Sequence, residues 1–136
     1  MTTTAVKLLK TIQSEAVIND AEQVFPVAAT PDVDFVRQGD VYIWLRSKMP
    51  KNAEPIKAVS QLAPGTTKGS RHCLDSLEGV SMFAMPDANE LQGPLLKLEC
   101  ERVVTHPEHG DWRLPAGLYE ITYQRAFAEE LRRVRD

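Results

Sequence analysis

The sequence lacks the features that would place it in a membrane, outside the cell or on nucleic acid. It has no run of 18 apolar residues, which a membrane-spanning helix requires. Residues 1–10 show no apolar stretch that ends in a cleavage site for secretion. Its two cysteines do not suggest a disulfide framework. The 16 Lys and Arg residues are outnumbered by 19 Asp and Glu residues, which disfavours phosphate-backbone binding. We therefore predict a cytoplasmic protein with reduced thiols.

What the sequence does contain is typical of one globular domain. Its 136 residues are 43% hydrophobic and 26% charged. Apolar residues between positions 3 and 18 recur every three or four residues, which predicts an amphipathic helix that packs on the domain or on a second copy. Pro26 and Pro31 interrupt the periodicity that follows. We predict a helical segment over 1–24, a linker over 25–36 and one β-rich domain over 37–136.

Short strands dominate that domain. Val41, Ile43 and Leu45 alternate with more polar residues, and the same alternation recurs over 96–103 and 119–123. No long helical pattern separates the strands, so a parallel βαβ arrangement is not expected. The prediction is a mainly β (α+β) fold, a small antiparallel barrel or rolled sheet, because closure removes exposed edges. A short C-terminal helix is expected over 126–134.

The three histidines are the candidate chemical residues. His72 precedes Cys73, while His106 and His109 flank Pro107 and Glu108. If the strands near 72 and 105 are neighbours, the three imidazoles converge. Three such ligands and an open position could hold a divalent metal such as zinc, with Glu108 as a general base. The same residues are also typical of an exposed turn, so both interpretations stay open.

The aromatic residues also allow two interpretations. Tyr42, Trp44, Trp112, Tyr119 and Tyr123 lie in predicted strands. Alternating aromatic residues usually fill a core. They can also form a half-buried face that binds a ligand or a partner.

Several motifs together resemble a known pattern. They are Arg37-Gln38-Gly39-Asp40-Val41, the segment 105–110, and the turn and strand Leu114-Pro115-Ala116-Gly117-Leu118-Tyr119. They are similar to an uncharacterised family of small β-rich proteins from bacteria, phages and mobile elements. That family has a Gly-His-x-His stretch, a His-x-Glu-His segment and a Leu-Pro-x-Gly-x-Tyr turn. Here Ser70 replaces the first histidine of the first stretch. The resemblance implies a fold and an origin on a mobile element, but no activity.

Two functions follow from these observations. The first is a non-enzymatic accessory or binding protein, acting as a monomer or as a homodimer joined through the N-terminal helix or the aromatic face. Its partner would be a small molecule or a protein, and it needs no cofactor. The alternative is a metal-dependent hydrolytic enzyme with His72, His106 and His109 as ligands and Glu108 as its catalytic residue.

Overall fold

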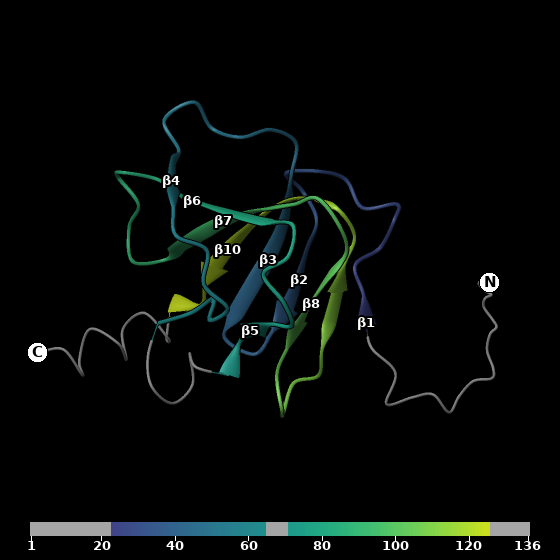
Figure 1. The fold of residues 1–136 in the computed structure, drawn as a ribbon. Coiled ribbons are helices and arrows are strands. Elements are labelled where there is room, and N and C mark those ends of the chain that lie inside the picture. Colours follow the sequence, from purple (N-terminus) through teal and green to yellow (C-terminus); the bar gives the residue numbers. More distant parts are fainter. Residues whose placement is uncertain (1–22, 65–70, 126–136) are drawn as a thin grey trace, which may run out of the picture.

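The structure, a computed structural model, describes residues 23–64 and 71–125 and is mainly β. Figure 1 shows short strands that follow one another along the chain. Their bounds are β1 Gln23–Val24, β2 Phe35–Gln38, β3 Val41–Arg46, β4 Glu54–Ile56, β5 Cys73–Leu74, β6 Val80–Ala84, β7 Gln92–Leu98, β8 Arg102–Thr105, β9 Trp112–Leu114 and β10 Gly117–Tyr123.

The strands form two sheets. The larger has the order β2-β3-β10-β7-β6-β4 and all its pairs are antiparallel, while the smaller has the order β1-β9-β8-β5. Among the described strands neither sheet closes, because β2 does not pair with β4 and β1 does not pair with β5. The predicted mainly β fold is confirmed, but a closed barrel is wrong. Buried residues of the smaller sheet pack against the apolar face of the larger one.

One core lies between the two sheets. Ile43 and Ile121 from the larger sheet and Val104 and Leu114 from the smaller one are all fully buried. Each buried aliphatic side chain contributes about 1.5–3 kcal/mol when it is removed from water. Tyr119 joins this core, and its hydroxyl donates a hydrogen bond of 2.8 Å to the Pro115 carbonyl.

The alternation read from the sequence matches the two long central strands. In β3 and β10, every second residue is buried, from Val41 to Ile43 and from Tyr119 to Tyr123. The single strand expected over 96–103 is instead two strands. The chain turns at 99–101 and passes from β7 in the larger sheet to β8 in the smaller one. Charge alternation continues through this turn, so periodicity alone did not reveal it.

Several predictions fall near or beyond the described residues. The expected N-terminal and C-terminal helices lie in 1–22 and 126–136, outside the described part of the chain. Within the segment expected to be a linker, Phe25 is buried and packs edge-on against Tyr119, with ring centroids 5.4 Å apart. The division into 1–24, 25–36 and 37–136 stays a prediction. Over the described ranges, no helix has the length and apolarity needed to cross a membrane.

Gly93 of β7 lies against the Tyr123 side chain of β10, and we expect Gly93→Ala to destabilise the fold. A Cβ atom there would lie 2.5 Å from the Tyr123 hydroxyl and 3.0 Å from the Ile121 carbonyl oxygen. The buried Tyr123 would have to move, which would strain its 3.1 Å hydrogen bond to the Leu62 carbonyl. Overpacking of this kind costs about 1–3 kcal/mol, measurable by urea unfolding.

The Tyr123→Phe background supplies the control for this prediction. Removal of the hydroxyl takes away the closest atom, so Gly93→Ala should cost less there than in the parent protein. An equal cost in both backgrounds would contradict the proposed steric cause.

Candidate functional site

The three predicted site histidines lie side by side in the structure. Strand β5 pairs with β8 through Cys73 and Thr105, which places His72 next to the turn that carries His106 and His109. The rings of His72 and His106 have centroids 4.6 Å apart, and those of His106 and His109 are 4.5 Å apart. The exposed fraction of the side chain rises from 2% for His72 to 6% for His106, and His109 is exposed. We call these residues, together with Gln38, the histidine cluster.

Gln38 organises the buried end of the histidine cluster. Its amide nitrogen donates hydrogen bonds to the carbonyls of Val104 at 3.0 Å and Gly110 at 2.7 Å. Its Oε1 is therefore the acceptor for Nδ1 of His72, at 2.8 Å. Nδ1 of His72 then carries the proton, and Nε2 is left with a lone pair. The sequence analysis singled out no role for Gln38, because glutamine is mostly an exposed residue.

His106 has the opposite tautomer. Its Nδ1 accepts hydrogen bonds from the backbone N–H groups of Glu108 at 3.0 Å and His109 at 3.1 Å. Nδ1 must therefore hold a lone pair, and the ring proton is on Nε2. Burial lowers the pKa of His106, and the neighbouring His109 lowers it further. The side chain thus closes its own turn as a neutral imidazole.

His109 and Glu108 face solvent at the end of the cluster. His109 packs over Gly39, where a Cβ atom would lie 2.6 Å from the imidazole Cδ2. Gly39 also has a φ of +59°, which glycine adopts without strain. The Glu108 carboxylate forms a 2.8 Å ion pair with Arg71, so this candidate base is already paired with a cation.

The predicted metal site stays a prediction. Among residues 23–64 and 71–125, no group of three or more His, Cys, Asp or Glu side chains is arranged to hold a metal ion. A metal on Nε2 of His106 would also require a proton on Nδ1, where two backbone N–H groups already donate. His72 has the tautomer that metal ligation needs, because its Nδ1–H is fixed by Gln38.

A second candidate site covers the side of the larger sheet that faces away from the core. Strand alternation places on this side residues from β2, β3, β10, β7 and β6 that lie opposite one another in register. We call this side the outer face; it comprises Phe35, Arg37, Tyr42, Trp44, Arg46, Ser81, Phe83, Leu95, Lys97, Leu118, Glu120 and Thr122.

The middle of the outer face is a mainly apolar row that crosses the strands. Phe35 pairs with Trp44, Trp44 with Glu120, Glu120 with Leu95, and Leu95 with Phe83. The Phe35 ring lies 4.5 Å from that of Trp44 and 5.5 Å from that of Tyr42, measured between centroids. Phe35 itself is 46% exposed and Trp44 is half-buried, whereas Leu95 is buried at 2% exposure. We call these five paired residues the central row.

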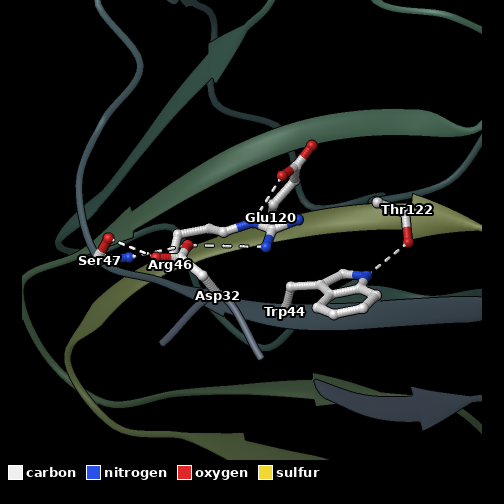
Figure 2. A network of polar contacts seen from close by, with 6 residues as sticks. All are labelled: Asp32, Trp44, Arg46, Ser47, Glu120 and Thr122. Atoms are coloured by element: carbon white, nitrogen blue, oxygen red, sulfur yellow. Dashed lines mark hydrogen bonds and ion pairs between the residues drawn. The ribbon is translucent and has the colours of Figure 1, made fainter. Parts of the chain in front are cut away.

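Arg46 and its partners hold the Trp44 side chain in place within this row, as Figure 2 shows. The Arg46 Nε donates to Glu120 at 2.8 Å, and its guanidinium lies 4.9 Å from the Trp44 ring centroid. The Trp44 indole N–H donates to the Thr122 hydroxyl at 3.0 Å. Asp32 approaches Arg46 at 3.8 Å and accepts a hydrogen bond from the Ser47 hydroxyl at 2.6 Å. The indole is therefore held in one orientation without burial in the core.

Arg37 occupies the opposite side of the central row. Its guanidinium lies 5.9 Å from the Tyr42 ring centroid and donates to the Gly39 carbonyl and the Gln124 side chain. None of these partners carries a negative charge. The aromatic residues of the sequence thus divide: Tyr119 and Tyr123 fill the core, whereas Tyr42 and Trp44 belong to the outer face.

The comparison with known proteins assigns the chain to a family and not to an activity. The family described as Domain of unknown function (DUF8820) matches residues 37–124. The chain belongs to this family. No curated protein and no solved structure matches it. The match supports the expected resemblance to an uncharacterised family, while an origin in bacteria, phages or mobile elements stays a prediction.

Proposed function

We propose that this domain is a non-enzymatic binding module that docks another protein on its outer face. The observation that carries the proposal is the central row, in which the exposed Phe35 packs against the half-buried Trp44, and Arg46 holds Trp44 in place. Tryptophan, tyrosine and arginine are the residues that most often dominate the energy of protein interfaces. The sheet presents all three together with little conformational freedom to lose on binding.

A protein partner fits the outer face better than single-stranded nucleic acid does. Bases bind to proteins by stacking on open aromatic rings. Here the rings of Tyr42 and Trp44 already hold the guanidinium groups of Arg37 and Arg46.

The test is selection from a displayed library of random peptides, followed by affinity measurement with the full chain. Binding by the selected peptides should fall at least about tenfold in Phe35→Ser, because an interface anchor of this kind contributes about 2 kcal/mol. Val59→Ser is the matched control, because Val59 has nearly the same exposure, 45%, and lies outside the outer face. EDTA should leave the affinity unchanged.

Two outcomes would contradict the binding module. One is a selection that enriches no peptide for the full chain. The other is a set of peptides whose affinity falls equally in Phe35→Ser and Val59→Ser. Loss of binding on addition of EDTA would instead favour the metal-dependent alternative built on His72, His106 and His109.

A further inference from the structure

We infer that the partner segment is acidic: an extended peptide with an aromatic or aliphatic centre, flanked by carboxylates, that runs diagonally over the outer face from Arg37 to Lys97 and crosses the central row at Trp44. This inference rests on the proposed function and names the chemistry of its partner. Its basis is the charge of the outer face, which differs from that of the whole chain.

The outer face is positive although the chain is negative. The outer face carries three cations, Arg37, Arg46 and Lys97, and one carboxylate, Glu120, so its formal charge is 3 − 1 = +2. The whole chain has a formal charge of −3. A positive patch on an acidic domain attracts an acidic partner and disfavours a basic one.

Two of the three cations have no carboxylate partner among the described residues. Arg46 is neutralised by Glu120 at 2.8 Å and lies near Asp32. Arg37 donates only to a carbonyl and an amide oxygen. Lys97 is exposed and forms no ion pair with a described residue. These two charges are therefore available to a ligand.

The register places the available charges on opposite sides of the central row. Arg37 pairs with Tyr42, two residues from the row in one direction, and Lys97 pairs with Leu118, two residues from it in the other. Arg37 and Lys97 are three strand spacings apart across the sheet and four residues apart along the strands, which gives a distance of roughly 20 Å. An extended peptide of roughly six residues covers that distance. Carboxylates near both of its ends would reach Arg37 and Lys97, and its centre would cross the central row at Trp44, against which Phe35 packs.

The experiment uses the full chain and two labelled peptides in fluorescence anisotropy at low salt. The acidic peptide is Asp-Asp-Trp-Leu-Asp-Asp, and the matched neutral peptide has Asn in place of each Asp. The acidic peptide should bind at least about tenfold more tightly, and added salt should reduce this difference.

Substitutions at the two unpaired cations locate the effect. Arg37→Gln and Lys97→Gln should each weaken the acidic peptide by about fivefold and leave the neutral one unchanged. Lys51→Gln is the control, because Lys51 is also exposed but lies in the loop before β4. It should change neither affinity.

The outcomes separate this inference from the proposed function. Equal affinity for the two peptides, with both lost in Phe35→Ser, would overturn the acidic partner and support the docking surface. Tighter binding of an oligothymidylate than of the acidic peptide would overturn both. Failure of both hexapeptides to bind would overturn the inference, and the library selection would then decide the proposed function by itself.

Discussion

Gln38→Leu should lower the free energy of unfolding by about 3–5 kcal/mol, because it leaves several buried polar groups without partners. Gln38 is fully buried and joins β2 to β8, to the turn at 106–110 and to His72. Leucine has a similar size but would leave the carbonyls of Val104 and Gly110 and the Nδ1–H of His72 unsatisfied. Urea unfolding of the full chain measures the loss.

Gln124→Leu and Gln38→Glu are the matched comparisons. Gln124 accepts an exposed hydrogen bond from Arg37, so its replacement should cost less than about 1 kcal/mol. In Gln38→Glu, a carboxylate could still accept from His72 but could not donate to the two carbonyls. This variant should also be strongly destabilised. A loss below about 1 kcal/mol in both Gln38 variants would contradict the organising role of this side chain.

Because of His72, the protein should begin to lose stability at a pH above the range in which carboxylates titrate. Burial lowers the pKa of His72 from 6.5 to about 4, and the neighbouring His106 and His109 add to the effect. As the pH falls below 6.5, the unfolded chain binds a proton at this position and the folded protein does not. The stabilisation is therefore complete at pH 7 and is lost progressively down to about pH 4.

The measurement is the free energy of unfolding at pH 7 and pH 5. We expect a loss of about 2 kcal/mol attributable to His72 over this interval. His72→Gln is the control, because its amide can donate to Gln38 but does not titrate. The variant should show a correspondingly smaller loss between the two pH values. An identical pH dependence in the parent protein and in His72→Gln would contradict the neutral buried state of His72.

Alternation was enough to predict β3 and β10, whereas the meeting of the histidines was a hypothesis that required two strands to be neighbours. Strands β3 and β10 have one apolar and one mixed face, which is visible in the sequence from Val41 to Arg46. The pairing of β5 with β8 then brings His72 to His106, as the neighbouring-strand hypothesis required. Such local patterns carry information because the side-chain period of a strand is two.

The features that the sequence analysis missed depend on contacts between distant segments. Gln38 is a polar residue whose burial becomes favourable only when β8 and the 106–110 turn supply acceptors 66 and 72 residues away. Phe35 lies in the stretch expected to be a linker, yet it begins β2 and completes the aromatic pair with Trp44. The division of the strands between two sheets likewise depends on a turn at 99–101 that interrupts no charge pattern.

Chemical-shift mapping of the full chain with a selected peptide tests the docking surface most directly. Amide signals of β2, β3 and β10 should shift, with the largest changes around Phe35 and Trp44, while those of His72, His106 and His109 stay in place. Changes centred on the three histidines, with β3 unaffected, would show that the histidine cluster rather than the outer face is the binding site.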